Sequence, residues 1–83
     1  MKQIFYASAE WCGPCKALKP IIHEIIRETG IHVNFIDVDA SPEFVSKYGI
    51  TSVPTILVLD ASGNVVVRKT GVIPKSALLQ ILL

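Results

Sequence analysis

Short apolar runs rich in β-branched residues alternate along the chain with longer segments in which apolar residues recur every three or four positions. The short runs predict four strands, over residues 4–7, 32–38, 55–59 and 65–70. Five residues that include Gly63 separate the last two runs, and this loop suits a β-hairpin. We therefore expect the third and fourth strands to be antiparallel.

The segments between the strands have the period of helices. The longest covers residues 14–29, where five apolar residues share one helical face and Gly30 supplies a C-terminal stop. These five are Leu18, Ile21, Ile22, Ile25 and Ile26. A short helix is expected over residues 42–48, opened by a proline, and a third from residue 74 to the end of the chain.

The resulting order, β-α-β-α-β-β-α, predicts an α/β fold with a central four-stranded mixed sheet flanked by helices. A strand, a helix and a second strand within about 40 residues form a βαβ unit, so the first two strands should be parallel. With 83 residues, the chain is expected to form a single domain over residues 1–83.

Composition and charge narrow the class of protein. Hydrophobic residues make up 51% of the chain and charged residues 18%, which is opposite to the signature of disorder. Eight Lys and Arg balance seven Asp and Glu, and because the basic residues are scattered we expect no nucleic-acid partner. We also expect no membrane span, because no apolar run approaches about 18 residues, and no signal sequence. An intact soluble protein of a reducing compartment is the expectation.

The candidate chemistry lies in two cysteines, Cys12 and Cys15, between the first strand and the first helix. A C-x-x-C pair beside a βαβ unit points to redox chemistry, and residues three apart on a helix lie close enough for a reversible disulfide. Cys12 faces the positive end of the helix dipole, which favours its thiolate. We therefore expect Cys12 to attack a substrate disulfide and Cys15 to resolve the mixed disulfide.

Other uses of a C-x-x-C pair fit the sequence less well. Zinc needs four ligands, and the two available histidines, His23 and His32, have the wrong spacing; His23 also falls on the polar face of the first helix. Haem attachment needs a histidine where Lys16 stands, and an iron–sulfur cluster lacks two thiolates. Two unrelated core cysteines remain as the alternative to redox function. No metal site is predicted.

The segment Ala9-Glu10-Trp11-Cys12-Gly13-Pro14-Cys15-Lys16 resembles the active-site signature of the thioredoxin family. The resemblance continues at Pro20, at residues 47–55, which are similar to the family's cis-proline segment, and at Gly71. It implies that Cys12 is the nucleophile, that Cys15 is the resolving thiol, and that Pro54 is cis and packed against them. It also implies a flat apolar patch for substrate proteins, formed by Trp11, Gly13, Pro14, Val53, Pro54, Gly71 and Val72.

From this resemblance we expect a cytoplasmic, monomeric thiol–disulfide oxidoreductase. Its substrates would be disulfide-containing proteins, its reductant an NADPH-linked thioredoxin reductase, and its only redox group the Cys12–Cys15 disulfide. Two alternatives stay open. One is a glutaredoxin-like redoxin reduced by glutathione, although the double glycine and the acidic residue of glutaredoxins are missing after Gly71. The other is a binding subunit with a thioredoxin fold and no catalysis.

The sequence departs from the family pattern at one buried site and in length. Where thioredoxins carry a buried aspartate and a lysine on the neighbouring strand, this chain has Tyr6 and Phe35. Replacing both members of a charged pair leaves no unpaired buried charge, but it removes a carboxylate that could deprotonate Cys15. The chain also begins at the core βαβ unit, so we expect a minimal thioredoxin of glutaredoxin-like size.

Overall fold

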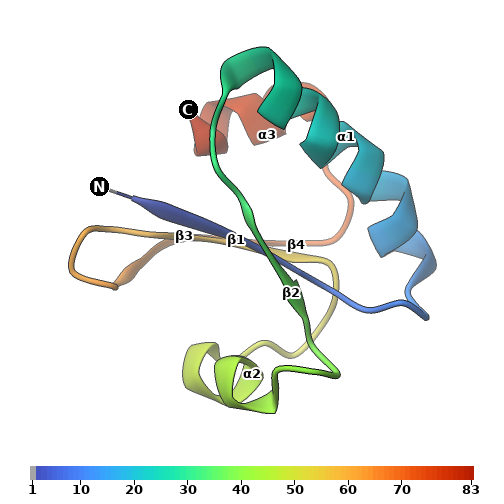
Figure 1. Cartoon of the computed structure of the whole chain (residues 1–83), viewed down its shortest axis with the longest axis vertical. Helices are drawn as coiled ribbons and strands as arrows, with labels where there is room; N and C mark the ends of the chain where they lie inside the picture. The colour runs from blue at the N-terminus through green and yellow to red at the C-terminus, as the bar shows by residue number, and fades with distance from the viewer. Residues whose placement is uncertain (1) are drawn as a thin grey trace.

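A computed structural model describes residues 2–83, in which helices lie on both faces of one sheet (Figure 1). The elements are β1 (Gln3–Ser8), α1 (Gly13–Thr29), β2 (Asn34–Asp37), α2 (Pro42–Tyr48), β3 (Thr55–Leu59), β4 (Val65–Thr70) and α3 (Lys75–Leu82). The predicted order is confirmed. The one clear difference is β2, which is shorter than the predicted strand and begins at Asn34 rather than at His32.

The sheet has the strand order β2-β1-β3-β4. Strands β1 and β2 are parallel, while β3 is antiparallel to both β1 and β4, so the expected strand directions are confirmed. Helices α1 and α3 cover one face and α2 covers the other (Figure 1). All five residues of the central strand β3 are buried, as expected for a strand with helices on both of its faces.

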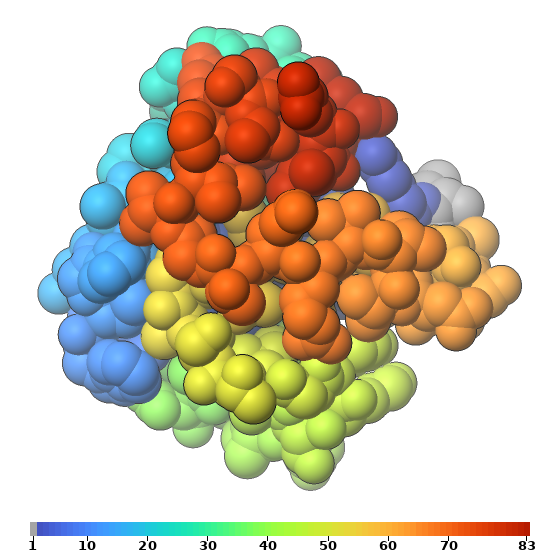
Figure 2. All heavy atoms as spheres, turned by 180° about the vertical axis from the view of Figure 1, so that it is seen from behind, coloured from blue at the N-terminus to red at the C-terminus, as the bar shows by residue number. Residues whose placement is uncertain are grey.

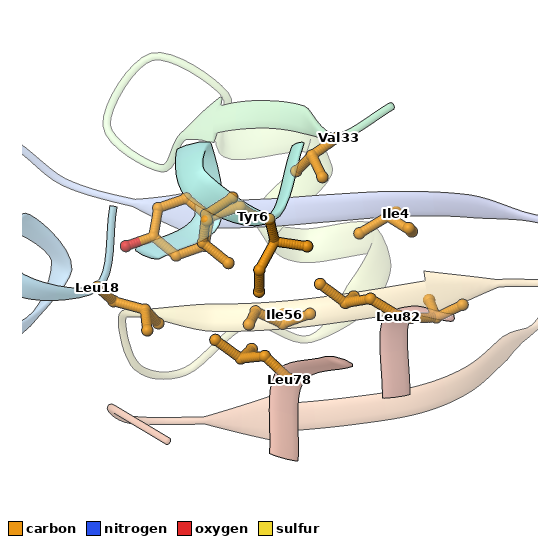
Figure 3. Packing of buried hydrophobic residues seen from close by; sticks show 10 residues of the cluster. Ile4, Tyr6, Leu18, Val33, Ile56, Leu78 and Leu82 are labelled. Atoms are coloured by element: carbon orange, nitrogen blue, oxygen red, sulfur yellow. The ribbon is translucent and has the colours of Figure 1, made fainter. Parts of the chain in front are cut away.

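The larger core cluster lies between the sheet and the helices α1 and α3 (Figure 3). The apolar stripe predicted for α1 faces it: Leu18, Ile22 and Ile25 are almost fully buried, and Ile21 and Ile26 pack at its margin. Gly30 ends this helix in the left-handed conformation, with φ of 73°. The stripe therefore fixes which face of α1 meets the sheet and which stays in solvent.

A smaller cluster anchors α2 to the opposite face. Its aromatic part joins β1 to α2: the ring of Phe5 lies 4.9 Å from that of Phe44, which lies 4.7 Å from the ring of Tyr48. Arg68 of β4 donates a hydrogen bond to the Tyr48 carbonyl at 2.6 Å. None of the helices in residues 2–83 is long and apolar enough to cross a membrane.

Lys75 ties the start of α3 to α1 through ion pairs with Glu24 and Glu28. The hydrogen bond from Lys75 lowers the pKa of Glu24, and the bond to Glu24 raises the pKa of Lys75. The lowered carboxyl pKa stabilises the fold at neutral pH, and that stabilisation is lost as the pH falls through the pKa of folded Glu24. The raised pKa of Lys75 also stabilises the fold. This stabilisation is fully present below pH 10.5 and is lost as the pH rises through the pKa of folded Lys75.

We expect Lys75→Met to lower the melting temperature at pH 7 by roughly 2–5 °C, because exposed ion pairs contribute little individually. The difference from wild type should shrink at pH 2. Thermal unfolding followed by circular dichroism at pH 2 and pH 7 measures this difference in melting temperature. Lys69→Met on β4 is the control for loss of one positive charge. An equal difference at pH 2 and pH 7 would show that the ion pairs are not its source.

Candidate active site

The two cysteines lie where the chain leaves β1 and enters α1. Cys12 is the N-cap of α1, Cys15 is in its first turn, and the two form a disulfide with a Cα–Cα distance of 5.3 Å. The pairing predicted from the sequence is therefore confirmed. Since both residues belong to one helical turn, the bond can open and close without moving any other element.

The sulfur of Cys12 accepts a hydrogen bond from the backbone N–H of Cys15 at 3.1 Å. It does so at the N-terminus of a 17-residue helix, where unpaired N–H groups and the helix dipole favour negative charge. In the reduced protein the same N–H is placed to donate to a thiolate at Cys12. The local backbone thus stabilises the charged, reactive form of Cys12.

Little of either cysteine is open to solvent: Cys12 is 4% exposed and Cys15 3%. Both pack with Ala9, and Val38 and Val53 lie against them. A substrate disulfide therefore has to contact the surface immediately around the pair in order to reach a sulfur.

Trp11 is held outside this apolar cluster and is 70% exposed. Its indole N–H donates to the carboxylate of Asp39 at 2.8 Å, and the backbone N–H of Asp39 donates to Asp37 at 3.0 Å. Sequence reasoning missed Asp39. The available signal was topological, because residues that follow two adjacent parallel strands emerge at the same edge of the sheet.

The second predicted segment lies beside the cysteines. The Val53–Pro54 peptide bond is cis, Val53 packs against the cysteine pair, and the Pro54 carbonyl accepts a hydrogen bond from Gly71 N–H at 2.9 Å. A hollow of about 280 Å³ opens between Trp11 and Val53. In Figure 2 the yellow segment near residue 54 lies between the blue start of α1 and the orange-red chain that follows β4.

The seven residues expected to bind substrate thus come from three neighbouring segments, and they differ in how far their side chains are exposed to solvent. Trp11, Gly13, Pro14, Gly71 and Val72 are exposed, and Val53 is half-buried. Pro54 is almost fully buried, so its side chain presents no open surface.

The comparisons with known proteins agree with this geometry. The thioredoxin family model matches residues 3–83. Thioredoxin from Bacillus subtilis is 46% identical over 72 residues, which is 84% of this chain and 68% of that protein. Thioredoxin from Rickettsia felis is 45% identical over 73 residues, or 86% of this chain and 69% of that protein. The chain belongs to the thioredoxin family.

Solved thioredoxins share its fold. A mutant thioredoxin from Halobacterium salinarum superposes with a TM-score of 0.87 at 32% identity, covering 98% of this chain and 71% of that one. Mitochondrial thioredoxin 3 from Saccharomyces cerevisiae, in its oxidised form, superposes with a TM-score of 0.81 at 29% identity, covering 98% of this chain and 76% of that one. The thioredoxin-like fold is confirmed, and with it a thiol–disulfide oxidoreductase with a dithiol active site that reduces protein disulfides.

This thioredoxin carries its redox group within the chain, as the Cys12–Cys15 disulfide. Within residues 2–83, no three His, Cys, Asp or Glu side chains gather in a way that could hold a metal ion. His23 is exposed on α1, as predicted, and stacks on the ring of Phe35 at 5.0 Å.

Tyr6 lies under the active site of this thioredoxin, at the position expected for a buried aspartate. Its ring is fully buried, and its hydroxyl donates to the carbonyl of Cys15 at 2.8 Å (Figure 3 shows the ring in the core). Burial raises the pKa of Tyr6 to about 12, so the hydroxyl stays protonated at neutral pH. Tyr6 can therefore orient the main chain at Cys15, but it cannot accept a proton from the thiol.

Phe35, the second departure from the family pattern, differs from expectation. We expected it to replace buried charge with buried apolar bulk, but it is 40% exposed. Only the edge of its ring meets Tyr6, with centroids 5.8 Å apart. The reason is topological, because β2 is the edge strand of the sheet and its side chains are covered from one side only.

Proposed function

We propose that this chain is a cytoplasmic thioredoxin that reduces the disulfides of other proteins and is itself reduced by an NADPH-linked thioredoxin reductase. The observation that carries the proposal is the Cys12–Cys15 pair at the N-terminus of α1, with the Cys15 N–H directed at the Cys12 sulfur. A pair that works as a reductant needs a reducing compartment, which supports a cytoplasmic location.

The reaction proceeds through two thiol–disulfide exchanges. The Cys12 thiolate attacks one sulfur of the substrate disulfide, forms a mixed disulfide and expels the other substrate sulfur as a thiolate. Cys15 then gives its proton to solvent, and its sulfur attacks that of Cys12, closing the intramolecular disulfide and releasing the second substrate thiolate. The substrate has gained two electrons, and the reductase returns two electrons from NADPH.

Substrate binding is assigned to the surface around the pair. Trp11 and Val72 offer exposed apolar side chains, and Trp11 is fixed by its hydrogen bond to Asp39. Val53 is half-buried against the cysteines, and its backbone is proposed to pair with an extended substrate segment. Because one chain carries both cysteines and the surface around them, a monomer is the proposed acting unit.

Coupled assays with insulin test the proposal. The protein is supplied with NADPH and either thioredoxin reductase or glutathione and glutathione reductase, and NADPH oxidation is followed for wild type and Cys12→Ser. We expect activity with thioredoxin reductase only, and none in the variant. Activity only with glutathione would replace the proposal by a glutaredoxin-like function, and a cellular role that survives Cys12→Ser would replace it by a binding function.

A further inference from the structure

The solvent side of α1 carries a row of three cationic side chains and one histidine. Lys16, Lys19, His23 and Arg27 follow one another at spacings of three, four and four, which places them on one face of the helix. All four residues are exposed. We call this row the α1 cationic face.

The acidic residues of α1 lie beside this row and are paired with a cation outside it. Glu24 lines the same hollow as Lys19 and Arg27, but its carboxylate, like that of Glu28, forms an ion pair with Lys75. Two further carboxylates, those of Glu10 and Asp37, lie near the start of the row. Around the hollow that runs from Lys16 to Arg27, three cationic side chains face the single carboxylate of Glu24, so this stretch keeps an excess of positive charge.

An exposed aromatic ring lies beside the row. Phe35, 40% exposed on β2, has the Lys19 ammonium 5.8 Å from its ring centroid, and the imidazole of His23 is stacked on it. An aromatic surface flanked by cations suits a ligand that combines negative charge with an apolar side chain.

Two hollows join these groups to the active site. One, of about 500 Å³, is lined by Cys15, Lys16, Lys19 and Phe35, and the next, of about 550 Å³, continues past the same lysines to Arg27. Neither shares a lining residue with the hollow between Trp11 and Val53. A groove thus leads away from the cysteine pair on the side of β2, separate from the apolar patch.

The length of the groove sets the size of its occupant. From Lys16 to Arg27 a helix rises about 16 Å, at about 1.5 Å per residue. An extended peptide covers that distance with about five residues, at about 3.3 Å each.

We propose that the α1 cationic face binds an acidic, extended segment of about five residues that flanks the target disulfide of the substrate protein. Carboxylates of the segment meet Lys16, Lys19 and Arg27, and an apolar side chain rests on Phe35. The inference rests on the proposed function, since it assigns a substrate class to that active site. A polypeptide is favoured over a nucleic acid because the groove starts at Cys15, whose disulfide partner Cys12 attacks the substrate disulfide, and the chain's other cations are scattered.

Matched peptides test this inference. Three peptides share one disulfide and differ in a five-residue flank that is acidic, neutral or basic, and their reduction is measured with dithiothreitol as the regenerating reductant. At low salt we expect kcat/KM for the acidic peptide to exceed that for the neutral one by about tenfold, through KM rather than kcat. The preference should largely disappear in 0.5 M salt, at a Debye length of about 4 Å.

The variant Lys19→Glu/Arg27→Glu, which lies outside the active-site signature, should abolish the preference and leave reduction of the neutral peptide unchanged. Lys47→Glu/Lys69→Glu, which changes the net charge equally on α2 and β4, should keep it. Equal kcat/KM for all peptides, or a preference that survives in the first variant, would overturn the inference while leaving the proposed function intact.

A binding measurement keeps the inference testable if no peptide is reduced. Fluorescence anisotropy with a labelled acidic peptide that lacks cysteine should show binding to the wild type at least fivefold tighter than to Lys19→Glu/Arg27→Glu. Such binding without turnover would contradict the proposed function alone, and equal binding would contradict the inference. A single-stranded RNA oligonucleotide of similar charge should bind more weakly than the peptide, and tighter RNA binding would overturn the assignment to an acidic protein segment.

Discussion

Replacing Cys15 with serine should leave a protein that attacks its substrate once and then stops as a stable mixed disulfide. The backbone N–H of residue 15, which donates to the Cys12 sulfur, is unchanged by the substitution. The nucleophile therefore keeps the hydrogen bond that stabilises its thiolate. What is lost is the second thiol, 5.3 Å away between Cα atoms, that would close the intramolecular disulfide.

The measurement is insulin reduction together with non-reducing electrophoresis and mass spectrometry of the product. We expect turnover by Cys15→Ser to fall to the uncatalysed background, while a covalent adduct of the protein with an insulin chain accumulates. Cys12→Ser should show neither turnover nor adduct. An adduct with Cys12→Ser instead of Cys15→Ser would mean that the two cysteines have the opposite roles.

Tyr6→Asp should speed up the resolving step while weakening the fold. Tyr6, with a pKa of about 12, offers no base beside Cys15 at pH 7. A carboxyl at this fully buried position would have its pKa raised by desolvation toward neutrality, where it can accept the thiol proton. Insulin reduction should then rise by roughly tenfold, short of the ~100-fold or more of a well-positioned base, because the aspartate is shorter than the tyrosine.

The same variant loses the packing of an aromatic ring and the hydrogen bond to the Cys15 carbonyl. Losses of this kind cost about 3–5 kcal/mol, so unfolding has to be measured alongside activity. Tyr6→Asp/Phe35→Lys supplies a cation on the neighbouring strand and should recover part of the stability. Tyr6→Phe, which removes only the hydroxyl, should lose about 1 kcal/mol of stability and keep the wild-type rate.

A rate for folded Tyr6→Asp that is equal to or below the wild-type rate would contradict this account of the resolving step. The pH profile gives a second check. The rate of Tyr6→Asp should rise with pH as the new carboxyl ionises. The wild type has no carboxyl at residue 6, so its rate should lack this rise.

Local patterns were enough to predict most of the fold. The helical period of α1 is set by burial of one stripe and the run of β3 by burial of the whole strand, so both can be found from the sequence. Strand β4 is mostly exposed, and its β-branched residues and the hairpin loop before it are the signals that predict it. Strand β2 was predicted too long. In the structure the side-chain amide of Asn34 donates a hydrogen bond to the Ile4 carbonyl. A longer β2 would need a main-chain N–H to donate to that carbonyl, so the side chain takes the place of the next rung of the sheet.

The candidate site was predicted where its chemistry is local and missed where it depends on contacts between distant residues. The cysteine pair occupies one helical turn, so the spacing of the two cysteines in the sequence is enough to predict it. The contact between Trp11 and Asp39 joins residues 28 apart in sequence. The partner of the Tyr6 hydroxyl is a main-chain carbonyl, which leaves no trace in the choice of amino acid.

The position of Cys12 as the N-cap of α1 means that one atom serves both folding and chemistry. Helices are usually started by oxygen-bearing side chains that take no part in reactions. Here the acceptor that begins the helix is the sulfur that attacks the substrate, so the N–H of Cys15 serves both the start of the helix and the nucleophile. A substitution at residue 12 therefore removes a cap and a reactive group at once.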